Sequence, residues 1–181
     1  MLTSAGLSLE VIRPLVDEVT LQGQFQHLSP SDLALQLAHA KALSVSTTHP
    51  DRLVIGADQT LECDGELYHK ARSITEATRN LRKLSGKTHH LHSAVSLVFN
   101  DQELFCHTSR ASLTMWPLSE AFMTSYASRE AEALLQSVGG YHFEGFGVQL
   151  FEKVEGDIHT ILGLPLLPLL AFLRSQAIIG S

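Results

Sequence analysis

Segments whose apolar residues recur at the helical period alternate along this chain with segments whose apolar residues recur at the strand period. Apolar residues at helical spacing run from residue 30 to 45, and Ser29 followed by Pro30 is a typical helix start. Ser73 and Glu76 have the spacing of a capping box, and they open a second apolar-periodic segment. We predict helices over residues 30–45 and 73–84, after Ser119, over 128–138 and over 166–177.

Strand patterns lie between these helices. Leu53-Val54-Ile55 is a continuous apolar run typical of a buried strand, and it leads into Gly56-Ala57-Asp58-Gln59. Hairpins are expected around Asp64-Gly65 and around Asn100-Asp101. Further short strands are expected over residues 9–12 and 148–154. The pattern predicts a single α/β domain over residues 1–181, with a mixed sheet flanked by helices.

Composition and charge narrow the class of function. The chain has 181 residues, with 13 Lys and Arg against 19 Asp and Glu, and a net charge of −6. This acidic balance argues against binding to nucleic acid or to an anionic membrane surface. The most apolar stretch, Ile161–Leu173, is shorter than the roughly 20 residues that cross a bilayer. With only two cysteines and no basic leader, the protein is expected in the cytoplasm.

Candidate chemistry begins at Asp58. In open α/β sheets ligands bind beyond the carboxyl ends of strands, so a carboxylate after the Leu53–Ile55 run can face a cleft; otherwise it caps a turn. Lys41 and Lys70 are either solvated lysines or, if they turn toward Asp58, binders of phosphate oxygens.

Two other motifs carry less weight. His89, His90 and His92 invite a metal site, but neighbours on a strand point to opposite faces, so a partly exposed hairpin face is the better account. The glycine-rich segment from Gly139 to Gly147 lacks the spacing of a P-loop or a dinucleotide-binding loop.

Ordered sequence blocks nevertheless resemble one known family, the Maf family of nucleotide pyrophosphatases. The similarity covers nearly the whole chain. The blocks are Gly56-Ala57-Asp58-Gln59, Asp64-Gly65-Glu66-Leu67-Tyr68-His69-Lys70, Leu84-Ser85-Gly86-Lys87-Thr88-His89, Gly140-Tyr141-His142-Phe143-Glu144-Gly145-Phe146-Gly147, and Val154-Glu155-Gly156-Asp157 with Leu162-Gly163-Leu164-Pro165-Leu166.

This resemblance implies an enzyme that cuts a nucleoside triphosphate between its α- and β-phosphates, with a fold shared with inosine triphosphatases. Asp58 would activate the attacking water, and Lys41 and Lys70 would hold phosphates. A divalent cation, Mg²⁺ or Mn²⁺, would bind Glu18 and Asp58.

Gln59 and Glu144 are the candidate specificity residues, because this pair resembles the subgroup that acts on 7-methyl-GTP. Guanine presents two adjacent donors, N1–H and the 2-amino group, which a carboxylate accepts in a bidentate manner. The alternative is a pyrophosphatase with broader specificity for nucleoside triphosphates.

The chain departs from the family at its start. The first strand and the Ser-x-Ser-x-x-Arg-Arg phosphate loop of the family have no counterpart before Leu7. Two other hypotheses therefore stay open: a catalytically weak nucleotide-binding relative, and a cell-division regulator that binds partners. The expected partner is the nucleotide substrate, and a homodimer stays open.

Overall fold

The computed structural model describes residues 1–180. It separates into two compact units. The first contains residues 1–59, 92–110 and the segment from 158 to the end of the described chain, and the second contains residues 60–91 and 111–157.

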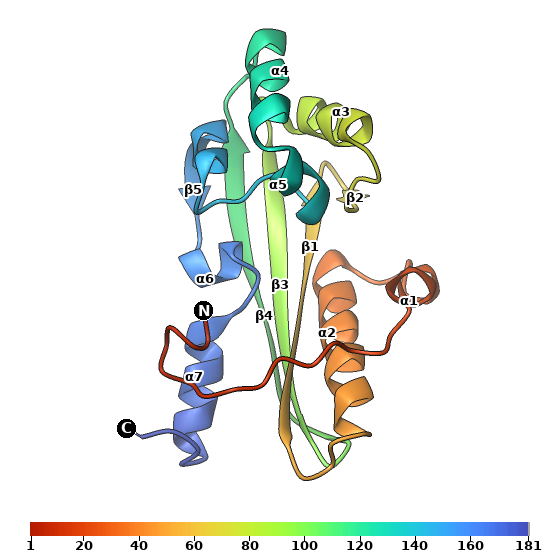
Figure 1. Ribbon diagram of the computed structural model, residues 1–181, viewed down its shortest axis with the longest axis vertical. Helices are drawn as coiled ribbons and strands as arrows, with labels where there is room; N and C mark the ends of the chain where they lie inside the picture. The colour runs from red at the N-terminus through yellow and green to blue at the C-terminus, as the bar shows by residue number, and fades with distance from the viewer. Residues whose placement is uncertain (181) are drawn as a thin grey trace. The chain divides into compact units, whose positions relative to one another are not determined.

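The strands form one sheet in the order β2-β1-β3-β4-β5 (Figure 1). Their bounds are β1 Leu53–Cys63, β2 Glu66–Tyr68, β3 Thr88–Phe99, β4 Gln102–Met115 and β5 Phe151–Glu155. Strands β1, β3 and β4 each contribute residues to both units.

The sheet is antiparallel, whereas the sequence pattern predicts a mixed one. The β1–β2 and β4–β5 pairs are antiparallel. Cys63 at the end of β1 donates its thiol hydrogen bond to the carbonyl of Thr88 at the start of β3, so these neighbours also run in opposite directions. Asn100 and Asp101 join β3 to β4 with φ angles of 50° and 59°, as a type I′ hairpin requires. The hairpin at β2 reverses the chain after β1, so the chain returns through α3 to β3 in the direction opposite to β1 and the two strands are not parallel. The α/β class is confirmed.

In the first unit, helices cover both faces of β3. Its helices are α1 Glu18–Gln24, α2 Pro30–Ser46, α6 Ile158–Ile161 and α7 Leu166–Ser175. Val95 and Leu97 of β3 pack in a cluster with Leu169 of α7, whereas Ala94 packs against Ala38 of α2. Because neighbouring strand residues point to opposite faces, α2 and α7 lie on opposite sides of the strand.

The N-terminal segment of the first unit differs from the prediction. Residues 7–17 contain no regular secondary structure, so the strand expected over residues 9–12 is absent. The segment makes no strand ladder, which an extended stretch needs to count as a strand. In Figure 1 it runs from the α7 side of the unit to α1, beside α2.

The second unit packs α3 Ile74–Leu84, α4 Glu120–Arg129 and α5 Ala131–Gln136 together. The side chains of Ser73 and Ser119 accept the capping hydrogen bonds of α3 and α4, as their sequence positions predict. The strand expected from residue 148 begins only at Phe151, because a 3₁₀ helix occupies Phe146–Leu150.

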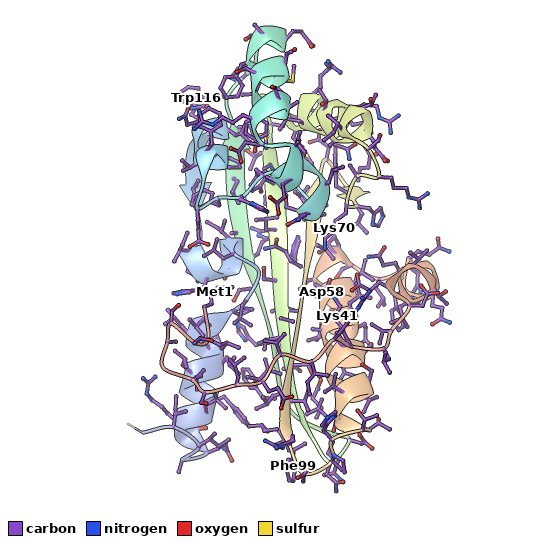
Figure 2. The ribbon with its side chains drawn as sticks, viewed as in Figure 1. Met1, Lys41, Asp58, Lys70, Phe99 and Trp116 are labelled. Atoms are coloured by element: carbon purple, nitrogen blue, oxygen red, sulfur yellow. The ribbon has the colours of Figure 1, made fainter. Side chains whose placement is uncertain are left out.

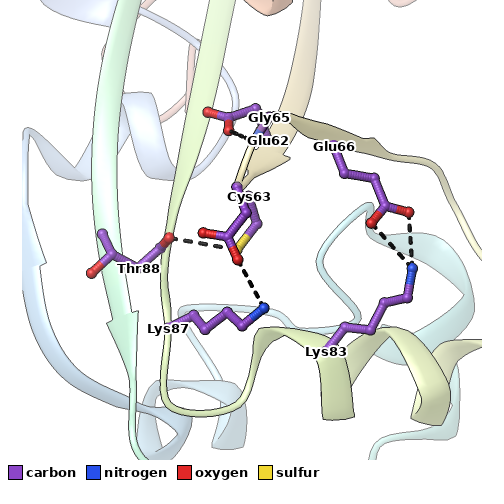
Figure 3. A network of polar contacts seen from close by, with 8 residues as sticks. Glu62, Cys63, Gly65, Glu66, Lys83, Lys87 and Thr88 are labelled. Atoms are coloured by element: carbon purple, nitrogen blue, oxygen red, sulfur yellow. Dashed lines mark hydrogen bonds and ion pairs between the residues drawn. The ribbon is translucent and has the colours of Figure 1, made fainter.

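Two charged pairs link the β1–β2 hairpin to α3 and to the segment between α3 and β3 on the surface of this unit (Figure 3). Lys83 lies 2.8 Å from Glu66, and Lys87 lies 2.8 Å from Asp64. These side chains are exposed, so each pair adds little stability, on the order of 0–1 kcal/mol.

None of the helices in residues 1–180 has the length and apolar character of a membrane span.

Candidate functional site

Asp58 lies inside strand β1 rather than beyond its end. The sequence pattern places the end of the strand just before this residue, but β1 continues to Cys63, so that prediction is wrong. Polar residues interrupt the apolar pattern from Asp58 onward. The strand nevertheless continues, because its backbone is hydrogen-bonded to the neighbouring strands β2 and β3. The carboxylate therefore projects from a strand face toward a helix.

A glycine allows that helix to come close. A Cβ atom at Gly56 would overlap the carbonyl oxygen of Ala38 and lie 2.7 Å from the backbone nitrogen of Ala42. Only glycine fits such an approach of two backbones. Gly56 and Asp58 are two residues apart on one strand, so they share a face, and Lys41 adjoins Ala42 on α2. The close packing of α2 on β1 thus brings Lys41 to Asp58.

Lys41 contacts two carboxylates, those of Asp58 and Glu18. Figure 2 shows Lys41 of α2 beside Asp58 of β1. Its Nζ atom lies 2.5 Å from Asp58 Oδ1 and 2.9 Å from Glu18 Oε1. The Asp58 side chain is 11% exposed and that of Lys41 19%, whereas Glu18, at the start of α1, is 47% exposed. Three residues that the sequence assigns to one site, Glu18, Lys41 and Asp58, are therefore in contact.

The electrostatics keep Lys41 charged. Burial by itself lowers the pKa of an ammonium, but the charges and hydrogen bonds of Asp58 and Glu18 outweigh it and leave the pKa of Lys41 above its ordinary value. Lys41 is thus a fixed positive charge at neutral pH and does not act there as a base. Such a charge suits the binding of phosphate oxygens.

A cavity of about 470 Å³ opens beside this cluster. It is lined by residues 13–19, except Leu15, and by Lys41. Arg13 contributes a cation to the lining. Nothing in the sequence marks this residue as part of a site, because an arginine in an irregular segment carries no local signal.

Gln59 points away from Asp58. Its Nε2 atom donates to Ser93 Oγ at 2.8 Å and to the backbone carbonyls of Thr160 at 3.0 Å and Ile161 at 3.2 Å. Ser93 Oγ in turn donates to the same Thr160 carbonyl at 2.6 Å. As adjacent residues of one strand, Gln59 and Asp58 face opposite sides, and the Gln59 amide holds α6 in place. The sequence offered no signal for the part of Ser93 in this network.

Lys70 and Glu144 belong to the second unit, and both side chains are exposed. Lys70 follows β2, and Glu144 lies in the turn before the 3₁₀ helix. That helix is anchored by Phe146, whose ring is covered by the Arg129 guanidinium at 4.1 Å and stacks with Tyr126. The functional roles of Lys70 and Glu144 stay predictions.

His89 is a buried residue of the second unit. Its Nε2 atom lies 2.7 Å from the hydroxyl of Tyr141, and its Nδ1 atom has no hydrogen-bond partner. Burial, with a smaller effect of His90, lowers the pKa of His89 to about 4, so the ring is neutral at pH 7.

Within residues 1–180, no group of three or more His, Cys, Asp or Glu side chains is arranged to hold a metal ion.

Comparison with known proteins agrees with the resemblance. The model of the Maf-like protein family matches residues 1–176. A 7-methyl-GTP pyrophosphatase of Rhizobium meliloti is 46% identical over 100% of this chain and 92% of its own length. A nucleoside triphosphate pyrophosphatase of Nitrobacter hamburgensis is 48% identical over 99% of this chain and 89% of its own. A family match of this extent, with relatives aligned over almost their full length, shows that the chain belongs to the Maf-like protein family.

Proposed function

We propose that this protein is a nucleoside triphosphate pyrophosphatase, which hydrolyses the bond between the α- and β-phosphates and releases a nucleoside monophosphate and pyrophosphate. The observation that carries the proposal is the contact of Lys41 with Asp58 and Glu18 beside a cavity, in a Maf-like chain whose relatives bear this activity in their names. Phosphoryl chemistry depends mainly on positioning and on charge neutralisation, and this cluster supplies fixed charges for both.

Asp58 is the proposed general base. Its carboxylate takes a proton from the water whose oxygen forms the new bond to phosphorus, while the phosphoanhydride bond breaks and the electron pair leaves with pyrophosphate. Lys41 holds Asp58 in place and offers its charge to phosphate oxygens. For Lys70 we propose a second phosphate contact.

The carboxylates fit a divalent cation. Glu18 and Asp58 contact the same ammonium, so their oxygens face one small volume, and hard oxygen ligands suit Mg²⁺ or Mn²⁺. Mg²⁺ typically binds one or two carboxylates together with substrate phosphates, so a pair suffices. When bound, the cation would neutralise charge on the triphosphate.

For the base we propose 7-methyl-GTP or a related guanine nucleotide. Glu144 is an exposed carboxylate suited to the paired donors of guanine. Gln59 would act on specificity through the α6 turn that its amide holds. Relatives with the broader name are as similar as those named for 7-methyl-GTP, so broad specificity is the competing proposal.

We also propose that the chain works in the cytoplasm as one Maf-like domain. Both cysteines are free thiols, which suits a reducing compartment. A homodimer remains a prediction that light scattering would decide.

The test is pyrophosphate release from 7-methyl-GTP, GTP, UTP and dTTP with Mg²⁺ or Mn²⁺. Asp58→Asn should lower kcat by about 100-fold or more, because a general base typically contributes that much. Asp51→Asn removes an exposed carboxylate of the same unit, just before β1, and should leave the rate unchanged.

Equal rates for the wild type and Asp58→Asn would overturn the catalytic role of Asp58. Faster turnover of UTP or dTTP would reject the guanine preference but not the pyrophosphatase activity. A wild type that releases no pyrophosphate from any triphosphate would reject the activity itself.

A further inference from the structure

Arg13 is a cation of the cavity lining that has no acidic partner within 4 Å among residues 1–180. The charge of Lys41 is matched by Asp58 and Glu18. Asp17 caps α1 and accepts hydrogen bonds from Val19 N at 3.1 Å and Thr20 Oγ1 at 2.6 Å. Within residues 1–180, Arg13 forms no ion pair.

The local backbone favours a constant position for Arg13. Pro14 follows it, and the residue before a proline is restricted to extended conformations. The guanidinium is always charged, and its planar set of N–H donors matches the oxygens of a phosphate in a bidentate manner. Arg13 is also exposed, so it meets a ligand without losing an existing partner.

We propose that Arg13 binds the β- and γ-phosphates of the substrate, the part that leaves as pyrophosphate. The inference rests on the proposed pyrophosphatase function and extends it to a residue outside the Asp58 cluster. The β- and γ-phosphates carry most of the negative charge of a triphosphate, whereas the monophosphate product lacks them. Arg13 therefore distinguishes the substrate and pyrophosphate from the monophosphate product.

The experiment compares the wild type with Arg13→Gln, Arg13→Lys and the control Arg52→Gln, which removes an exposed arginine of the same unit near β1. For Arg13→Gln we expect KM for the triphosphate to rise about tenfold, the effect of one lost charged hydrogen bond. The value of kcat should change little, because the contact holds the substrate and the transition state alike. The KM of Arg13→Lys should lie between those of the wild type and Arg13→Gln. A lysine ammonium keeps the charge but lacks the planar pair of N–H donors that binds a phosphate in a bidentate manner.

Product inhibition gives a second readout. The inhibition constant of inorganic pyrophosphate should rise with KM in Arg13→Gln, while that of the nucleoside monophosphate stays constant. Calorimetry of pyrophosphate binding to the wild type and Arg13→Gln measures the same contact without turnover. Equal thermal unfolding midpoints would show that the variants are folded.

Unchanged KM and pyrophosphate binding in Arg13→Gln would overturn the proposal, as would an equal effect of Arg52→Gln. A loss confined to kcat, or an equal weakening of the monophosphate, would also contradict it. An inactive wild type would reject the pyrophosphatase function, and pyrophosphate calorimetry would still decide the role of Arg13.

Discussion

Lys41 is the residue on which the candidate site depends, because its ammonium contacts both Asp58 and Glu18. Lys41→Met would leave the mostly buried Asp58 carboxylate without this cation. We expect a loss of about 2 kcal/mol in the free energy of unfolding, less than for a fully buried pair since Glu18 is half exposed. Urea denaturation at pH 7 measures this loss.

A double-mutant cycle is the matched control for this prediction. In an Asp58→Asn background, Lys41→Met should cost clearly less, because the buried charge is gone. Additive losses in the cycle would show that the ion pair contributes nothing to stability.

His89 makes stability depend on pH. Its pKa is about 4 in the folded protein and near 6.5 when unfolded, so the unfolded state binds the extra proton between these values. The free energy of unfolding therefore keeps its full value, as far as His89 is concerned, above pH 6.5. As the pH drops from 6.5 to 4, protonation of the unfolded state lowers it by about 3 kcal/mol. The physical reason is burial, which penalises the charged imidazolium, with a smaller effect of His90.

Urea denaturation between pH 4.5 and 7.5 would test this. His89→Gln should flatten the pH dependence, and His27→Gln, an exposed control, should not. A wild-type slope that persists in His89→Gln would assign the effect to other groups.

At the scale of elements, Gly56 sets the distance between β1 and α2. Gly56→Ala forces the two backbones apart, and we expect a loss of about 1–3 kcal/mol with reduced activity, because Lys41 moves with the helix. Gly23→Ala in α1 meets no atom within 4 Å and serves as the control. The test is the urea unfolding midpoint of each variant. Equal midpoints for Gly56→Ala and Gly23→Ala would contradict the close approach of β1 and α2.

The elements themselves were largely predictable. The helix from Pro30 and the hairpin at Asn100-Asp101 carry local signals, a capping serine in one and a two-residue turn in the other, and both form as expected. The prediction was wrong where regular structure depends on neighbours. The segment over residues 9–12 is mostly apolar but pairs with no strand. Strand β1 continues past the polar Asp58 because adjacent strands pair with it.

For the whole molecule, three strands run through both compact units. Disrupting either unit removes ladder partners from strands that continue into the other, so we expect a single cooperative unfolding transition. Trp116, the single tryptophan, reports on the second unit, and far-UV circular dichroism reports on both. Coincident midpoints in urea are expected, and two separate midpoints would show that the units unfold independently.

The sequence by itself determined the α/β class, most helices and strands, and the family, because these depend on local caps, turns and ordered blocks of residues. It also named Glu18, Lys41 and Asp58. Only the tertiary structure decided that an ammonium lies between those carboxylates, that Gln59 faces the opposite side of β1, and that Arg13 lines the cavity. The reason is that contacts between residues far apart in the chain depend on how closely the elements pack, and the close approach at Gly56 has no signature in the order of residues around it.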